Sequence, residues 1–324
     1  MKEERCAGRA ALCCTHMSKT IRANLLLLLT AIIWGSAFVA QDVAMNDMGP
    51  FTFNAVRMAL AVLVLLPSIK LLDRAARKRN PGREVQTLRT MSKDQKRRLI
   101  TGGLVCGSVM AAGVSLQQYG LLYTSPGKAG FVTALYIVLV PVTGIFFRHR
   151  VRALTWGAVA LCAVGLFLLM VTESLTVGLG DLLVLLSAFC FTAHILVIAH
   201  YSPQMDGVRL SCAQFVVADV IFIVLTLLFE QPRIGDILAG WAPIVYAGVL
   251  SCGVAYTLQI IAQRDTAPTV ASLLMSLESV FSVLAQWVIL GDLLTARELL
   301  GCLIMFGGIV LAQLPEKKAR ESLA

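Results

Sequence analysis

Residues 25–41 read LLLLLTAIIWGSAFVAQ, and residues 182–198 read LLVLLSAFCFTAHILVI. Both are apolar runs close to the roughly 20 residues that a helix needs to cross a bilayer. A shift of 157 residues aligns them and places Trp34 on Phe191, with a hydroxyl residue four positions earlier in each run. The match indicates that a membrane-spanning segment of the first half of the chain returns in the second half.

The repeat extends beyond this pair of segments. The same shift places Arg57 on Gln214, and a shift of 142 places residues 129–135 (AGFVTAL) on residues 271–277 (ASLLMSL). The shift becomes smaller because the first half has a longer connector between its second and third spans. If each half contains five spans, the second half enters the membrane from the opposite side. Such inverted repeats are typical of secondary transporters.

Composition places the whole chain in the membrane. Of the 324 residues, 57% are hydrophobic and 15% are charged, whereas a soluble domain averages about 25% charged residues. Little sequence remains for a separate soluble domain. We predict an all-α integral membrane protein with ten transmembrane helices arranged as two inverted five-helix repeats. The predicted spans are residues 23–42, 50–71, 99–123, 126–147, 152–171, 180–201, 209–229, 238–262, 267–290 and 295–314.

The distribution of Lys and Arg predicts the orientation. The net charge of +9 does not indicate nucleic-acid binding, because most of the cations lie in the connectors on one side of the membrane. With the N-terminus in the cytoplasm, only Lys128, Arg233 and Arg297 of the 28 Lys and Arg fall outside, and Arg57 falls within a span. Because cytoplasmic loops retain Lys and Arg, we expect both termini to be cytoplasmic and the protein to lie in the plasma membrane.

The ends of the chain are expected to lie outside the bundle. Residues 1–16 are polar and Cys-rich, and Met17 opens a short basic run before the first span, so Met17 is an alternative translation start. The nine cysteines lack the paired spacing of a zinc site. The expected organisation is a cytoplasmic leader at 1–17, a first repeat at 18–171, a second repeat at 172–315 and a cytoplasmic tail at 316–324.

One connector is long and basic. Residues 73–98 contain RAARKRN and KDQKRR, and we interpret this charge as a signal that sets topology near anionic headgroups. The alternative function for the chain is a non-transporting membrane scaffold or sensor that acts through this connector.

Motifs of enzymes are absent from the sequence. It contains no His-Glu-x-x-His, no Gly-x-Ser-x-Gly and no P-loop. We therefore expect neither catalysis nor a cofactor or metal, and any uphill transport must draw on an ion gradient or on another solute.

Four ionisable residues fall inside predicted spans, where a charge costs about 2.5–3.5 kcal/mol on insertion scales and normally faces a cavity or a partner. We assign Glu278 to charge or proton coupling, and His194 as its companion because imidazole titrates near neutral pH. Arg57 and Asp219 are interpreted as structural charges that pair with each other or with a neighbouring helix. For Glu278 and His194 too, a purely structural role stays open.

Polar and aromatic side chains share helix faces with these groups. Trp34 lies on a stripe of span 1, and Tyr256 and Gln259 lie on a stripe of span 8. Gln118 in span 3 and Tyr136 in span 4 are further polar groups, and the 142-residue shift places Tyr136 on Glu278. Because lipid excludes such groups, we expect these five to bind substrate, with hydrogen bonding between helices as the alternative.

Several motifs resemble the EamA-type branch of the drug/metabolite transporter superfamily. Residues 30–38 (TAIIWGSAF) resemble its first-helix signature, and Arg57 resembles its recurrent arginine. Residues 123–129 (YTSPGKA), followed by LYIVLVP, look like its third-to-fourth helix hairpin, and residues 276–281 (SLESVF) are similar to the hairpin of the second half. The resemblance covers about residues 18–315.

The resemblance implies ten helices around a central cavity lined mainly by spans 1, 3, 4, 6, 8 and 9. It also implies transport of small metabolites such as amino acids, or of toxic amphiphilic compounds. The expected partners are thus a small-molecule substrate and the lipid bilayer, with export by alternating access. Proton coupling and a homodimer stay open.

Overall fold

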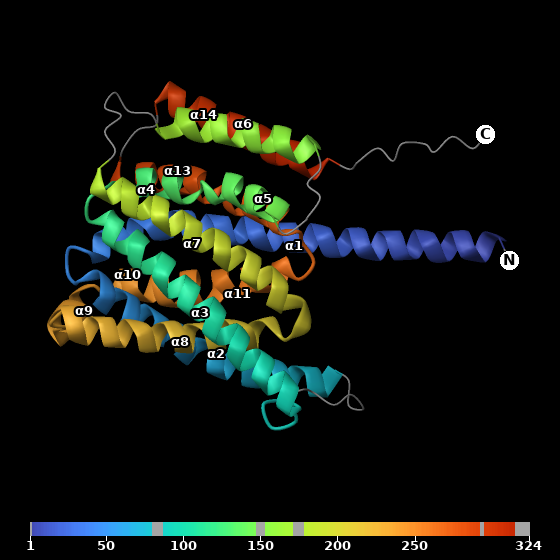
Figure 1. Ribbon diagram of the computed structural model, residues 1–324, viewed down its shortest axis with the longest axis horizontal. Helices are drawn as coiled ribbons and strands as arrows, with labels where there is room; N and C mark the ends of the chain where they lie inside the picture. The colour runs from blue at the N-terminus through green and yellow to red at the C-terminus, as the bar shows by residue number, and fades with distance from the viewer. Residues whose placement is uncertain (1, 80–86, 147–152, 171–177, 292–294, 315–324) are drawn as a thin grey trace.

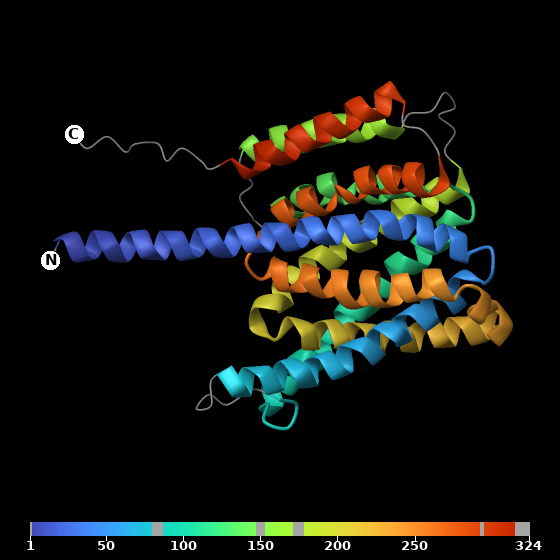
Figure 2. The ribbon, with the colours of Figure 1, turned by 180° about the vertical axis from the view of Figure 1, so that it is seen from behind.

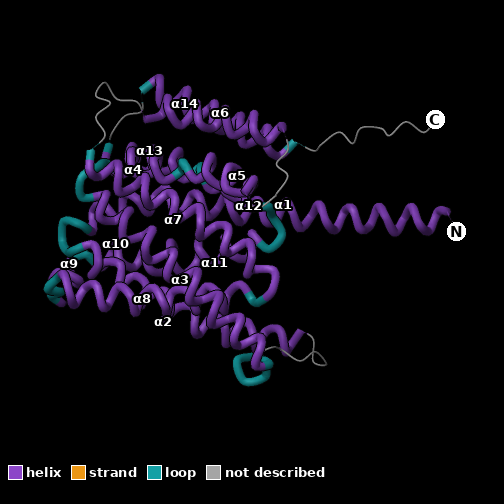
Figure 3. Tube along the Cα trace, in the orientation of Figure 1, coloured by secondary structure: helices purple, strands orange, loops and turns teal. Residues whose placement is uncertain are grey.

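The apolar runs fold into helices, because every backbone N–H and C=O group within lipid must find its hydrogen-bond partner inside the segment or a neighbouring one. A computed structural model of the chain describes residues 2–79, 87–146, 153–170, 178–291 and 295–314, and every regular element in these ranges is helical (Figure 3). The expectation of an all-α membrane protein is confirmed.

The helices follow one another with short connections. In chain order they are α1 (Lys2–Ala44), α2 (Pro50–Arg79), α3 (Lys93–Leu121), α4 (Pro126–Thr133), α5 (Tyr136–Phe146), α6 (Ala153–Met170), α7 (Leu179–Tyr201), η1 (Ser202–Gln204), α8 (Gly207–Phe229), α9 (Ile234–Ala239), α10 (Trp241–Val245), the π-helix η2 (Tyr246–Tyr256), α11 (Thr257–Gln263), α12 (Pro268–Met275), α13 (Glu278–Leu290) and α14 (Ala296–Gln313).

Seven helical segments of the described chain are long and apolar enough to cross a membrane: Lys19–Ala44, Pro50–Lys78, Lys93–Leu121, Leu179–Gln204, Gly207–Phe229, Trp241–Gln263 and Pro268–Leu290. The described residues of the predicted spans 126–147, 152–171 and 295–314 are also mainly helical, but their continuous apolar helices are shorter. A multi-pass membrane protein is therefore established, and the arrangement of ten helices as inverted repeats stays a prediction.

Two predicted spans are interrupted rather than continuous. The segment at 126–147 breaks between α4 and α5, and the segment at 267–290 breaks between α12 and α13. At each break the backbone bonds tighten from the α-helical spacing of four residues to three, as in Leu135 N–H to Val132 O and Leu277 N–H to Leu274 O. The two breaks lie 142 residues apart, which is the shift found in the sequence.

The helices form a bundle in which the first and second halves of the chain pack against each other (Figures 1 and 2). At one edge α6 lies along α14, and toward the other edge α2 lies along α8. Between them α1 contacts α13 and η2, and α3 contacts α7 and α8. The outer surface carries exposed apolar side chains, such as the run at 227–229 near the end of α8, as expected of a surface that faces lipid.

The basic connector is shorter than predicted. The helix α2 continues to Arg79 and α3 begins at Lys93, so much of the 73–98 stretch extends these helices. A capping box at Ser92 and Gln95 starts α3, in which each side chain accepts a hydrogen bond from the backbone N–H of the other. Residues 80–86 of the connector, and the expected tail at 316–324, lie outside the described residues.

Gly35 allows the close approach of α1 to α13. A Cβ atom at this position would lie 2.6 Å from the carbonyl oxygen of Glu278 and would overlap Phe281. We expect the Gly35→Ala protein to melt at a lower temperature in detergent, because overpacking costs about 1–3 kcal/mol. Gly307→Ala is the matched control, since nothing lies within 4 Å of a Cβ there. Equal melting temperatures for the two variants would contradict the packing.

Candidate substrate cavity

A small cavity lies where helices of both halves meet. Its volume is about 40 Å³, which holds about one or two water molecules. Its wall is formed by Trp34, Ala37, Phe38, Gln41, Arg57, Gln117, Thr133, Tyr136, Phe191, His194, Ile195, Ser251, Tyr256, Gln259, Met275 and Glu278. The wall is therefore mainly aromatic and amide in character, with one carboxylate and one guanidinium.

The carboxylate is positioned by the two helix breaks. Tyr136 is the first residue of α5, Glu278 is the first residue of α13, and the tyrosine hydroxyl donates a hydrogen bond of 2.9 Å to Oε1 of Glu278. Both side chains are buried. The repeat-equivalent positions 136 and 278 thus touch each other across the centre of the bundle, where the two halves of the chain meet.

The guanidinium of Arg57 also contributes to the wall. Its Nη1 donates a hydrogen bond of 2.9 Å to Oε1 of Gln41, and its Cζ lies 4.9 Å from the centre of the Phe53 ring. Such a cation–π contact stabilises a desolvated cation. Nε of Arg57 has no hydrogen-bond partner among the described residues.

The contact of His194 with Gln214 in the second half resembles the contact of Gln41 with Arg57 in the first half. Nε2 of His194 lies 3.1 Å from Oε1 of Gln214, and Gln214 is the residue that the 157-residue shift places on Arg57. The imidazole ring also meets the edge of Tyr256, with 5.9 Å between the ring centres. Each half therefore uses the corresponding position of its second span to hold a polar side chain of its first span.

An aromatic pair covers one side of the cavity. The rings of Trp34 and Tyr256 lie 4.6 Å apart at an angle of 58°, and Trp34 Nε1 donates a hydrogen bond of 3.3 Å to the carbonyl of Ser251. Ser251 and Tyr256 belong to the π-helix η2, a geometry that is frequent at functional sites. Gln259, one turn beyond, has a buried Oε1 without a hydrogen-bond partner among the described residues.

Seven of the nine residues selected from the sequence line this cavity, and two do not. Gln118 is fully buried in α3 but points elsewhere, and its neighbour Gln117 takes the place in the wall, where Nε2 donates a hydrogen bond of 2.9 Å to Thr133 Oγ1. Gln118 was selected as a polar group within span 3, a property that its neighbour Gln117 shares. The polar Thr133 on the facing span was the signal that favoured Gln117.

Asp219 also lies away from the cavity. It is half-buried on α8, and its Oδ1 has no hydrogen-bond partner among the described residues. The expected pairing of Arg57 with Asp219 is not formed, since the contacts of the guanidinium are with Gln41 and Phe53. The two intramembrane charges that the sequence grouped together therefore occupy different environments.

No cluster of His, Cys, Asp and Glu suited to a metal ion occurs within the described residues. Cys106, Cys162, Cys212 and Cys252 are free thiols buried among apolar side chains. Free cysteine in such surroundings packs as a small hydrophobic residue.

The sequence and fold both have relatives among known proteins. The chain matches the EamA-like transporter family over residues 21–171 and again over residues 178–314. It is 29% identical over 301 residues to an uncharacterized transporter of Archaeoglobus fulgidus, a match that covers 91% of this chain and 87% of the relative. A crystal structure with 16% identity aligns over 90% of this chain and 98% of its own, with a TM-score of 0.68, which shows a shared fold.

Proposed function

Because the chain belongs to the EamA-like transporter family and is a multi-pass membrane transporter, we propose that it is a secondary carrier that exports a small organic metabolite by alternating access. The single observation that carries this proposal is the cavity between the two halves, with buried polar groups in its wall. Its carboxylate and its tyrosine come from equivalent positions, 278 and 136. A substrate site between inverted repeats is the arrangement that secondary carriers use.

The repeat itself supports the carrier mechanism. The family matches the chain twice, over residues 21–171 and 178–314, in agreement with the proposed repeats at 18–171 and 172–315. The paired helix breaks and the shift of 142 residues agree with this division. Ten helices with both termini in the cytoplasm, in the plasma membrane, remain part of the proposal on the strength of the positive-inside distribution of Lys and Arg.

The cavity volume favours a closed state. Pockets for small organic ligands measure about 300–1,000 Å³, whereas this cavity measures about 40 Å³. The solute therefore binds only after the halves move apart, as alternating access requires. Each break in α4/α5 and α12/α13 provides a point at which the segment bends.

The wall of the cavity points to the class of substrate. Glu278 and Arg57 place opposite charges on the same cavity, which favours a zwitterion such as an amino acid over a singly charged solute. Trp34, Tyr136 and Tyr256 present aromatic surfaces, which attract cationic amines as well as apolar groups. An amphiphilic toxic amine is the second class that these groups fit. Proton coupling would use Glu278, and His194 is its companion.

The proposal is tested by efflux from cells that overexpress the chain, measured against a panel of amino acids and toxic amines. We expect faster efflux of at least one panel member, and we expect Trp34→Ala to reduce it about tenfold, since loss of a desolvated aromatic contact costs more than 1 kcal/mol. Phe306→Ala is the matched control, because that ring is 58% exposed on the outer surface of α14. Equal efflux by both variants would remove the cavity assignment.

A second variant distinguishes the carrier from the alternative function, a scaffold or sensor that acts through the 73–98 connector. Deleting residues 80–86 shortens the connector without touching the cavity wall. Unchanged efflux after this deletion supports the carrier. Loss of efflux in the deletion variant, although its cavity residues are unaltered, supports the scaffold.

A further inference from the structure

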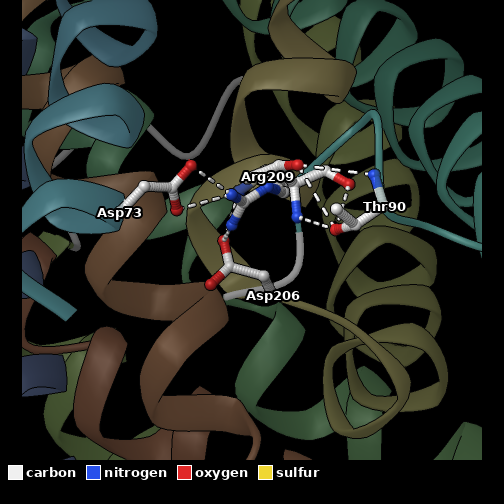
Figure 4. Close-up of polar contacts among 5 residues, drawn as sticks. Asp73, Thr90, Asp206 and Arg209 are labelled. Carbon is white, nitrogen blue, oxygen red and sulfur yellow. Dashed lines mark hydrogen bonds and ion pairs between the residues drawn. The ribbon is translucent and has the colours of Figure 1, made fainter. Parts of the chain in front are cut away.

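An ion pair joins α2 to α8 at the face of the bundle from which α1 projects, here called the N-terminal face (Figure 1). Nη2 of Arg209, at the start of α8, lies 2.6 Å and 2.7 Å from the two carboxylate oxygens of Asp73, near the end of α2 (Figure 4). Only 8% of the Arg209 side chain and 18% of the Asp73 side chain are exposed. The pair is therefore largely shielded from water, which strengthens it.

A second tie joins the same two helices at the opposite face. The carboxylate of Glu230, directly after α8, accepts hydrogen bonds from the backbone N–H of Phe51 at 2.9 Å and of Thr52 at 2.7 Å. It also accepts one from the Thr52 hydroxyl at 2.6 Å. Glu230 thus satisfies the free N–H groups at the start of α2, a role that a residue of the same helix usually performs.

The two ties are equivalent under the repeat. The shift of 157 residues places Asp73 on Glu230 and Thr52 on Arg209. In each tie, a carboxylate at the end of the second span of one half holds the third residue of the second span of the other half. One tie lies at one face of the bundle, and its equivalent lies at the other face.

The residues before the two helices explain why the ties differ in chemistry. Asp206 precedes α8 and caps that helix itself, accepting the Arg209 N–H at 2.9 Å. The equivalent residue before α2 is Gly49, which has no side chain to act as a cap. A Cβ atom at Gly49 would overlap the Glu230 carboxylate, so the glycine also makes room for the cap that α8 supplies.

We propose that Asp73–Arg209 and Glu230–Thr52 are two latches that close the carrier at its two faces and are released in turn during transport. This inference rests on the proposed alternating access. Both ties are formed in the structure, in which the central cavity is small. Asp73, Arg209 and Glu230 are thus positioning residues, which act on access to the cavity without touching the solute.

The test measures access to the cavity from each face. A single cysteine replaces Ser251 in the cavity wall of the full-length protein, whose native cysteines are replaced by Ala or Ser. A membrane-impermeant maleimide is applied to sealed right-side-out and inside-out vesicles. We expect Asp73→Asn to raise the labelling rate about tenfold from the N-terminal face, and Glu230→Gln to raise it about tenfold from the opposite face, because each loses a charge-assisted tie that holds one state closed.

Two variants separate a latch from a general stabilising contact. Asp206→Asn weakens the local cap of α8 and the longer ion pair of Asp206 Oδ1 with Arg209 Nη1, 3.4 Å in the parent. It leaves the Asp73–Arg209 tie, so we expect labelling from both faces to rise far less than in Asp73→Asn. Gly49→Asp supplies α2 with a local cap while displacing the Glu230 carboxylate. It is expected to raise labelling from the opposite face, as Glu230→Gln does, without loss of the folded protein on size exclusion.

The outcomes distinguish the latches from the carrier itself. In one outcome, the cysteine of the parent protein reacts from both faces, and the Asp73 and Glu230 variants change the labelling rate equally at both faces. The two ties then only hold α2 and α8 together, so the latch inference is overturned while the proposed carrier function stands. If the parent cysteine reacts from one face only under all conditions, alternating access fails and the inference fails with it. If the Asp73 variant is labelled faster from the N-terminal face and the Glu230 variant from the opposite face, the result supports both the latches and alternating access.

Discussion

The Glu278→Gln protein is expected to transport at least about tenfold more slowly than the parent, and without dependence on pH. Glutamine keeps the shape of the side chain and can still accept the hydrogen bond from Tyr136, which is 2.9 Å long in the parent. What is lost is the one carboxylate in the cavity wall. A hydrogen bond to a charged group contributes about 1.5–3 kcal/mol, and 1.4 kcal/mol corresponds to a tenfold change.

Counterflow into proteoliposomes over a range of pH measures this effect. Tyr136→Phe is the matched control, because it removes the hydroxyl partner but leaves the carboxylate. We expect that variant to slow transport while its pH dependence persists. Full, pH-independent transport by Glu278→Gln would remove Glu278 from its role in coupling.

Neutralising the two remaining intramembrane charges is expected to have unequal effects. Arg57→Gln should reduce transport about tenfold or more, because it removes the one guanidinium of the cavity wall and with it the opposite charge that a zwitterionic solute would meet. Asp219→Asn should stay within about twofold of the parent, the range of substitutions away from special contacts. Asp219 lies on α8, outside the cavity.

Comparing the Arg57→Gln and Asp219→Asn variants decides whether Arg57 has a structural role or acts in the solute pathway. The sequence favoured a structural role for both charges, and that interpretation predicts similar effects on transport and on the melting temperature. A selective loss of transport by Arg57→Gln, with the melting temperature unchanged, assigns the guanidinium to the solute pathway. Equal losses in both variants would return it to a structural role.

Other features of the site show where reasoning from sequence ends. Glu278 and Tyr136 could be selected because ionisable and polar groups in lipid need a partner, and the shift of 142 residues already related them. That the two side chains touch each other depends on the breaks before α5 and α13, which hydropathy does not record. The choice between Gln117 and Gln118 depends on the rotation of α3, and adjacent residues of a helix differ by about 100° in direction.

The sequence by itself determined the membrane location, the helical class, the internal repeat and several of the polar and aromatic residues around the cavity. Each of these follows from local composition and periodicity, which lipid enforces on every segment separately. Only the tertiary structure decided which residues meet across helices, such as Asp73 with Arg209 and Glu230 with Thr52. The reason is that such contacts join positions more than 130 residues apart, and their geometry depends on how whole helices pack.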